Sequence, residues 1–329
     1  MDWGAILQNT LEAAVSRDAI VYALAAIGLN IHFGYTGLLN FGQVGFMAVG
    51  AYGVGIGVVE FGLSIWVAVL IGIAAAVALA LLLGVPTLRL RADYLAIVTI
   101  AAGEILRFVF RAASLRDFTG GSNGINGFAD GFYSVNPYSG DLDLGIVDFS
   151  ARQLWVMTIG WLLVFGAVLL TFLLMRSPWG RVLKAIREDE DAVRALGKDV
   201  FGYKMQSLVL GGVIGAFGGM LLAISSGSVQ PDNYGTATTF FAYVALILGG
   251  TARIWGPVVG SVIFWALMAL TENLLRQAVE NNKIPDSIMD GVQVGQVRFM
   301  LVGLGLVLLL VFRPQGIFGD KREIELAVR

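Results

Sequence analysis

The stretch AIVYALAAIGLNIHFGYTGLLNFGQVGFMAVGAYGVGIGVV, residues 19–59, contains no Asp, Glu, Lys or Arg. As one α-helix these 41 residues would be about 60 Å long, twice the thickness of a hydrocarbon core of about 30 Å. The stretch therefore predicts two membrane passes. Glycines and amides interrupt its aliphatic pattern and indicate either a tight turn or a broken helix at Gly34, Gly37, Asn40, Gly42 and Gln43.

The composition of the whole chain agrees with a membrane protein. Of its 329 residues, 57% are hydrophobic and only 14% are charged, and the mean hydropathy is +0.77. Soluble domains carry about 25% charged residues, so a water-soluble globule is excluded. We predict an all-α, polytopic helical membrane protein that forms one transmembrane domain over residues 1–329.

Seven further apolar segments follow the first two and bring the predicted number of spans to nine, with a range of eight to ten because short segments can be re-entrant. They cover residues 61–88, 93–111, 153–175, 205–226, 234–252, 254–271 and 297–312. The small-xxx-small pairs Gly211/Gly215 and Gly256/Gly260 allow helices to approach closely in lipid. Residues 113–151 are polar and rich in Gly, Pro and Asp, and predict a long loop.

The distribution of basic residues predicts the orientation, because cytoplasmic loops of membrane proteins are enriched in Lys and Arg. Placing loop 176–204 and the C-terminal tail, 313–329, in the cytoplasm assigns 14 of the 22 basic residues to that side, with Arg89, Arg91 and Arg253 among them. Loop 113–151 then lies outside. The N-terminal residues lack the pattern of a cleaved signal peptide, so the first span is expected to direct insertion.

Several catalytic and binding patterns are absent from the sequence. There is no phosphate-binding G-x-x-x-x-G-K-[ST], no H-E-x-x-H, no G-x-S-x-G and no cysteine, and His32 is the single histidine. The net charge of −2 offers no basic surplus for nucleic acid. We therefore predict a protein without catalytic residues, cofactor or metal site, whose partners are the lipid membrane and other proteins.

The loop RSPWGRVLKAIREDEDAVRALGKDVFGYK, residues 176–204, contains the strongest functional pattern. Pro178 suits the start of a helix, Gly197 suits its end, and apolar residues recur at helical spacings, at Val182, Ile186, Val193 and Leu196. An amphipathic helix in a connector implies a surface to pack against, which is either the inner lipid headgroups or a cytoplasmic protein. The acidic residues 188–191 favour the protein, because an anionic leaflet repels them.

The loop, with the following GGVIGAFGGMLLA of residues 211–223, resembles the LivM-type permease subunit of ABC importers for branched-chain amino acids. The resemblance extends over nearly the whole chain. Its other segments are GLLNFGQVGFMAVGAYG (37–53), LRADYLAIVTIAAGEILR (90–107), GGSNGINGF (120–128), ILGGTARIWGPVVG (247–260) and FRPQGIFG (312–319).

The resemblance implies that EDAVRALG, residues 190–197, is a divergent form of the importer coupling motif E-A-A-x-x-x-G. Asp191 replaces one alanine, and the spacing to Gly197 is one residue longer. The helix would bind a cytoplasmic ATPase and transmit its movement. The residues implied in this coupling are Arg181, Lys184, Ile186, Arg187, Glu190, Ala192, Val193, Leu196 and Gly197.

The resemblance also implies partners, substrates and location. The partners would be a homologous LivH-type permease, two cytoplasmic LivG/LivF-type subunits that bind ATP, and an external solute-binding protein that docks on the outside. The chain would lie in a bacterial inner membrane and transport leucine, isoleucine and valine. Alternatives are urea, short amides or other amino acids, or a self-sufficient secondary transporter or channel, which would need coupling-ion ligands within the membrane.

Polar residues within the predicted spans are candidates for the translocation path. Asn30, Asn40 and Gln43, with His32 nearby, offer donors and acceptors without net charge, although each also suits interhelical hydrogen bonding. Glu104 and Arg107 lie three residues apart on one helix face and can pair. They indicate either a polar lining of the path or a structural ion pair near the outer interface.

Overall fold

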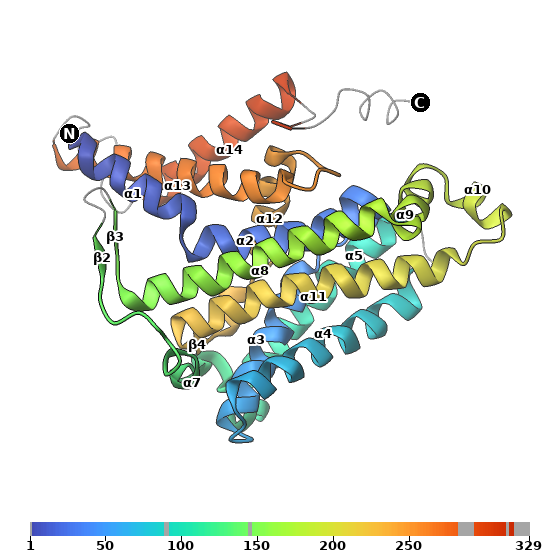
Figure 1. Cartoon of the computed structure of the whole chain (residues 1–329), viewed down its shortest axis with the longest axis horizontal. Helices are drawn as coiled ribbons and strands as arrows, with labels where there is room; N and C mark the ends of the chain where they lie inside the picture. Colours follow the sequence, from blue (N-terminus) through green and yellow to red (C-terminus); the bar gives the residue numbers. More distant parts are fainter. Residues whose placement is uncertain (1, 89–91, 144–146, 282–292, 314–315, 319–329) are drawn as a thin grey trace.

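The computed structural model describes residues 2–88, 92–143, 147–281, 293–313 and 316–318. It is almost entirely helical (Figure 1). The first half contains α1 (Trp3–Val15), α2 (Arg17–Leu29), a π-helix (Asn30–Tyr35), α3 (Gln43–Val59), α4 (Ile65–Thr87), α5 (Ala92–Arg111), α6 (Arg116–Thr119) and α7 (Asp130–Tyr133). The second half contains α8 (Ala151–Arg176), α9 (Pro178–Glu188), α10 (Glu190–Ala195), α11 (Val200–Ser226), α12 (Thr236–Gly249), α13 (Gly256–Glu280) and α14 (Val294–Phe312).

A helix occupies each predicted apolar segment, which confirms a polytopic helical membrane protein. Among the described residues, five helical segments are long and apolar enough to cross a membrane: Trp3–Tyr35 (α1, α2 and the π-helix), α4, α8, α11 and α13. Helices α3, α12 and α14 are shorter apolar helices, and α5 carries charged residues along its length. The number of nine full crossings therefore stays a prediction.

Helices α2, α3 and α11 form the centre of the protein, because their small residues permit close contact. A Cβ atom on Gly219 of α11 would lie 2.1 Å from the Met47 carbonyl oxygen of α3. A Cβ on Gly28 of α2 would lie 2.2 Å from the Gly211 carbonyl oxygen of α11. Between helices α12 and α13, the predicted close approach of Gly256 and Gly260 is confirmed, since a Cβ on Gly260 would lie 1.9 Å from the Ala245 carbonyl oxygen.

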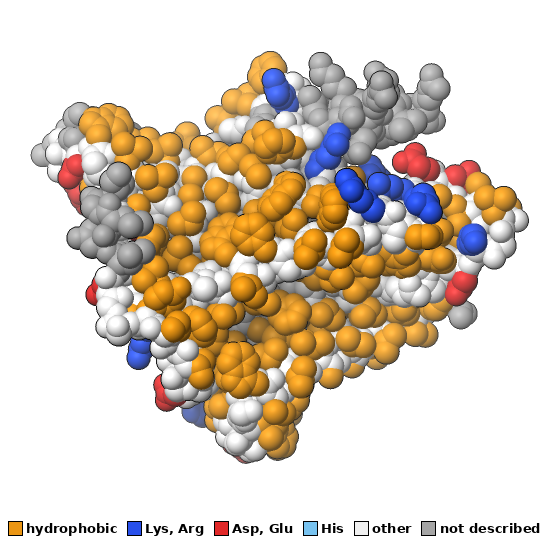
Figure 2. Space-filling model, in the orientation of Figure 1, with side chains coloured by type: hydrophobic (Ala, Val, Ile, Leu, Met, Phe, Trp, Pro, Cys, Tyr) orange, Lys and Arg blue, Asp and Glu red, His pale blue; other side chains and the backbone are white. Residues whose placement is uncertain are grey.

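The sides of the bundle are apolar. Large side chains on α8, such as Leu162, Phe165 and Leu169, are more than half exposed. Figure 2 shows hydrophobic side chains over most of the visible face, while Lys and Arg side chains gather around the end that carries α9. An exposed apolar surface between two charged ends is what lipid requires of a membrane protein.

The chain between α2 and α3 is a broken helix rather than a tight turn. Helix α2 widens into the π-helix, and residues 37–42 then run without helical structure before α3 begins at Gln43. Gly37, with φ of +74°, makes the turn. A left-handed backbone at this position is one that glycine adopts without strain.

The described part of residues 113–151 contains local structure that the pattern did not predict. Its short strand β1 (Ile125–Asn126) pairs antiparallel with β4 (Ser228–Val229), which follows α11. A second pair joins β2 (Leu142–Asp143) to β3 (Asp148–Phe149). These two pairs consist of two-residue strands, so the described chain remains mostly helical, in agreement with the predicted class. The β1–β4 pair ties residues 113–151 to the end of a central helix.

The predicted single helix over 178–196 is wrong, because the chain divides into α9 and α10. Asp189 between them is extended, with φ of −155° and ψ of 100°, and its side chain accepts a hydrogen bond from the amide of Ala192. An Asp that caps the following turn competes with helix continuation, and this explains the break. Helix α1 was also not predicted, and it packs against α13.

Candidate functional site

The apolar stripe of loop 176–204 faces the protein itself. Leu183, Ile186 and Val193 are at most 5% exposed and form a small core with Tyr35 and Val200. Ile186 and Val193, which the sequence placed in the coupling surface, therefore attach the loop to the bundle. Figure 1 shows α9 and α10 together at one end of the molecule.

Charged side chains fasten the same loop to neighbouring elements. An Arg187 Nη donates a hydrogen bond of 2.6 Å to the Gly34 carbonyl oxygen of the π-helix. Glu190 forms an ion pair with Lys204, whose side chain is only 10% exposed, and a second ion pair of 2.8 Å with Arg194. A buried ammonium requires such a partner, since the desolvated charge is costly alone.

The remaining predicted coupling residues lie on the outward face of the loop. Arg181, Lys184, Ala192 and Gly197 are exposed, and Leu196 is 80% exposed. Gly197 has φ of +76°, which confirms its predicted role in ending the helix. The loop thus presents cations, carboxylates and one large apolar side chain, Leu196, to its surroundings.

Three of the polar residues 30–43 form one hydrogen-bonded network at the centre of the bundle. The side-chain nitrogen of Asn40, Nδ2, lies 3.1 Å from His32 Nδ1 and donates a hydrogen bond of 3.1 Å to Gln43 Oε1. Gln43 Nε2 donates to the Gly211 carbonyl at 3.0 Å, and His32 Nε2 lies 3.1 Å from the Leu208 carbonyl. The interhelical hydrogen bonding that the sequence suggested therefore joins the broken helix to α11.

Asn30 forms a separate link, to the connection between α12 and α13. The Asn30 side-chain nitrogen, Nδ2, donates a hydrogen bond of 2.8 Å to the Arg253 backbone carbonyl. Its side-chain oxygen, Oδ1, accepts a hydrogen bond of 2.8 Å from the Ala252 backbone amide. Asn30, Asn40 and Gln43 are each at most 1% exposed. The structure thus brings them into the protein interior, and their role in lining a path stays a prediction.

We expect Asn30→Ala to lower stability, because it leaves the Arg253 carbonyl and the Ala252 amide without their partner. Unpaired buried polar groups cost about 1–3 kcal/mol each. The thermal unfolding midpoint of the purified chain in detergent should fall by several degrees. Asn233→Ala, at an exposed position, is the matched control. Equal midpoints for the two variants would contradict the importance of this link.

Glu104 and Arg107 form an ion pair of 2.8 Å on α5, as their spacing predicted. The cluster extends to Asp232, whose carboxylate lies 3.3 Å from Arg107 and 3.5 Å from Arg111. Glu104 also accepts hydrogen bonds from the amide and hydroxyl groups of Thr236, at the start of α12. The pair therefore joins α5 to α12 at the end of the molecule away from α9.

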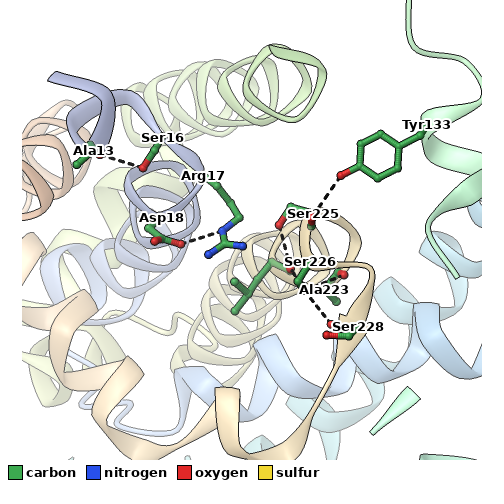
Figure 3. A network of polar contacts seen from close by, with 10 residues as sticks. Ala13, Ser16, Arg17, Asp18, Tyr133, Ala223, Ser225, Ser226 and Ser228 are labelled. Atoms are coloured by element: carbon green, nitrogen blue, oxygen red, sulfur yellow. Dashed lines mark hydrogen bonds and ion pairs between the residues drawn. The ribbon is translucent and has the colours of Figure 1, made fainter. Parts of the chain in front are cut away.

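A cavity of about 670 Å³ lies at the end of the bundle that carries α7. Figure 3 shows its polar wall, where Arg17 pairs with Asp18 at 2.9 Å and the Tyr133 hydroxyl donates to the Ser225 carbonyl at 3.3 Å. Arg152 and Asp130 also line it. Burial raises the pKa of Tyr133, so this hydroxyl stays protonated and can donate throughout the neutral range.

Comparison with known proteins identifies the family. The family described as "Branched-chain amino acid transport system / permease component" matches residues 13–311, which include the broken helix, the α5 cluster and loop 176–204. The chain belongs to this family. The resemblance drawn from the sequence is therefore confirmed.

Individual relatives agree with the family assignment. The high-affinity branched-chain amino acid transport system permease protein LivM of Escherichia coli strain K12 is 31% identical, over 92% of this chain and 69% of LivM. The LivH permease of the same system and strain is 26% identical, over 92% of each chain. The nucleoside ABC transporter permease protein NupC of Lactococcus lactis is also 26% identical, over 93% of this chain and 96% of NupC.

Sequence reasoning missed three residues that shape the site. Leu183 is fully buried in the core of the loop but lies outside the predicted stripe. Tyr35 and Lys204 contact the loop from the π-helix and α11. Lys204 is 14 positions from Glu190, so no helical spacing links the pair. The available signal in the sequence was a lysine at the start of an apolar helix, since such a charge requires a partner.

Proposed function

We propose that this chain is a membrane-spanning permease subunit of an ATP-driven importer of branched-chain amino acids. The observation that carries the proposal is the family match over residues 13–311. The apolar sides of the bundle and its five helices of spanning length support placement in a membrane. The chain itself performs no covalent chemistry, and ATP is bound and hydrolysed by partner subunits.

The exposed face of loop 176–204 is proposed to dock on a cytoplasmic ATPase. Arg181, Lys184, Ala192 and Leu196 supply charge and apolar area, while the buried half of the loop fixes it to the bundle. A loop anchored on one side and open on the other suits the transfer of a movement from a partner to the membrane helices. The basic residues around α9 support a cytoplasmic position for this end, by the positive-inside rule.

The other partners follow from the relatives. Similarity to both LivM and LivH supports pairing with a homologous permease. An external solute-binding protein would dock at the opposite end, where residues 113–151 lie. A bacterial inner membrane is the expected location.

Reconstitution of the complete importer tests the proposal. The chain, a LivH-type permease, both ATPases and the binding protein in proteoliposomes should accumulate leucine, isoleucine or valine only when ATP is supplied on the ATPase side. ATPases with an inactivated nucleotide site are the matched control. Uptake by this chain alone without ATP would instead support a secondary transporter. ATP-driven uptake of a nucleoside but not of leucine would overturn the proposed substrate, and NupC makes that comparison necessary.

A further inference from the structure

We infer that Arg187 is the positioning residue through which loop 176–204 acts on the interruption between α2 and α3. The inference rests on the proposed function, in which the loop receives movement from an ATPase. The loop acts first on one membrane segment, and one side chain connects the loop to that segment. The segment is the end of the broken helix, residues 34–42, and the connection is the hydrogen bond from Arg187 to Gly34.

The contact joins a charged donor to a helix end. An Arg187 Nη lies 2.6 Å from the Gly34 carbonyl oxygen, close to the C-terminal end of the π-helix Asn30–Tyr35. The last carbonyls of a helix lack intrahelical partners and form the negative end of its dipole. A guanidinium group is therefore well suited to hold this end, and a neutral side chain would hold it less firmly.

Other contacts besides the Arg187 hydrogen bond join α9 to the end of the broken helix. Helix α9 lies against the turn at Gly37, where an added Cβ would be 3.3 Å from Arg187 Cγ and 3.6 Å from its Cα. Tyr35 is 2% exposed in the core with Leu183 and Ile186, and its ring lies 5.8 Å from Lys184 Nζ. The end of the broken helix is thus covered by α9, so displacement of α9 acts on it directly.

Residues 37–42 are suited to respond to such a displacement. They form no helix, and individual hydrogen bonds hold their backbone, such as those from the Leu38 amide to the His32 carbonyl and from the Phe41 amide to the Thr99 hydroxyl. Gly37 provides a turn that accepts changes in backbone angles. A cavity of about 250 Å³ lies beside them, lined by Thr36, Gly37, Leu38, Ile186 and Arg187 among others. The segment therefore has space to move at Gly37 and Leu38, the end that lies next to α9.

The far end of this segment carries the central network. Asn40 and Gln43 connect it to His32 and to the Gly211 carbonyl of α11. A continuous series of contacts thus runs from the exposed loop through Arg187 and Gly34 to the polar centre of the bundle. A movement of the loop would therefore exchange hydrogen-bond partners in the central network. Two arrangements of the helices can each have their own set of such partners.

The experiment uses the complete importer and a cysteine probe, because this chain has no cysteine of its own. Leu38 is 3% exposed beside the junction, so Leu38→Cys reports whether residues 37–42 open. Thiol labelling is measured without nucleotide and in the vanadate-trapped state. We expect the two rates to differ at least about tenfold, as when a minor state becomes the major one. A chain without Leu38→Cys gives the background.

Arg187→Gln should remove this difference and uncouple the importer. The ATPases should remain bound and hydrolyse ATP, but stimulation by the loaded binding protein should be lost and uptake should fall about tenfold or more, as expected for a lost charged hydrogen bond. Arg187→Lys keeps a cationic donor and should restore part of the coupling. Arg276→Gln removes an exposed arginine of α13 and is the matched control, expected to leave both readouts unchanged.

Each other result overturns the inference. Nucleotide-dependent labelling and normal uptake in Arg187→Gln would show that the bond is only structural. Loss of the ATPases from the complex would make Arg187 a docking residue. Equal labelling of Leu38→Cys in both states with Arg187 intact would show that residues 37–42 do not move. If the importer with Arg187 intact showed no ATP-driven uptake at all, the proposed function would fail first and the inference with it.

Discussion

Gly219→Val is expected to abolish recovery of folded protein. A Cβ at position 219 would lie 2.1 Å from the carbonyl oxygen and 2.5 Å from the Cα of Met47, so it meets backbone rather than a movable side chain. Helices α3 and α11 would have to separate at the centre of the bundle. Overpacking of a core costs about 1–3 kcal/mol and more where the backbone must shift. The monodisperse fraction in size-exclusion chromatography of the detergent-purified chain measures the loss.

Gly166→Val is the matched control for this prediction. Gly166 also lies inside a helix of spanning length, α8, but no atom lies within 4 Å of a Cβ added there. The control should therefore purify as the unsubstituted chain does. A monodisperse Gly219→Val protein with unchanged thermal stability would contradict the close packing of α3 and α11.

Leu196→Asp is expected to abolish ATP-driven uptake without unfolding the permease. Leu196 is 80% exposed at the end of α10, on the surface proposed to bind an ATPase. As an anchor of the proposed interface, Leu196 would bury its apolar side chain against the ATPase, and loss of an anchor costs about 2 kcal/mol or more, or about 30-fold in Kd. Copurification of the ATPases with the tagged permease measures binding, and leucine accumulation in proteoliposomes measures uptake.

Leu196→Met controls for the substitution itself, because methionine keeps an apolar side chain of similar size. It should retain ATPase binding and uptake. Size-exclusion chromatography should show that Leu196→Asp stays folded, since an exposed position tolerates a charge. Undiminished ATPase binding by Leu196→Asp would remove Leu196 from the proposed interface, while uptake by the unsubstituted importer would still support the proposed function.

The positions of the membrane helices followed from the sequence because hydrocarbon imposes a simple requirement on each segment. Long uncharged runs such as residues 19–59 have no alternative to spanning or burial, and the five amide and glycine positions correctly marked the break between α2 and α3. The number of crossings was not determined in the same way. Helices such as α12 are too short for their length alone to show whether they cross.

The coupling loop shows where sequence reasoning reached its limit. Its apolar stripe correctly indicated a packed surface, but periodicity does not reveal whether the surface meets the same chain or a partner. Ile186 and Val193 proved to lie in one core with Tyr35, which is separated from them by more than a hundred residues. The break at Asp189 depends on a local side-chain cap that competes with helix propensity.

The polar candidates were identified by type, but their partners were not. Asn30 and Gln43 bond to the backbone carbonyls of Arg253 and Gly211, and a carbonyl carries no sequence signal. The Gln43 contact depends on the close approach of helices that Gly28 and Gly211 permit, and the Asn30 side chain fits against Gly34. The Glu104 and Arg107 pair was predictable because it is local, whereas its extension to Asp232 was not.

The central network also sets an order of events during synthesis. Gln43 leaves the ribosome 168 residues before the Gly211 carbonyl that it binds. At about 5–20 residues per second, roughly 8–35 s of translation separate the two partners. During that interval the amides of the first spans must be satisfied by water or by the insertion machinery, because hydrocarbon offers them no partner. A nascent chain halted before α11 should therefore remain beside the machinery that inserts it, and only the arrival of α11 should release it into lipid.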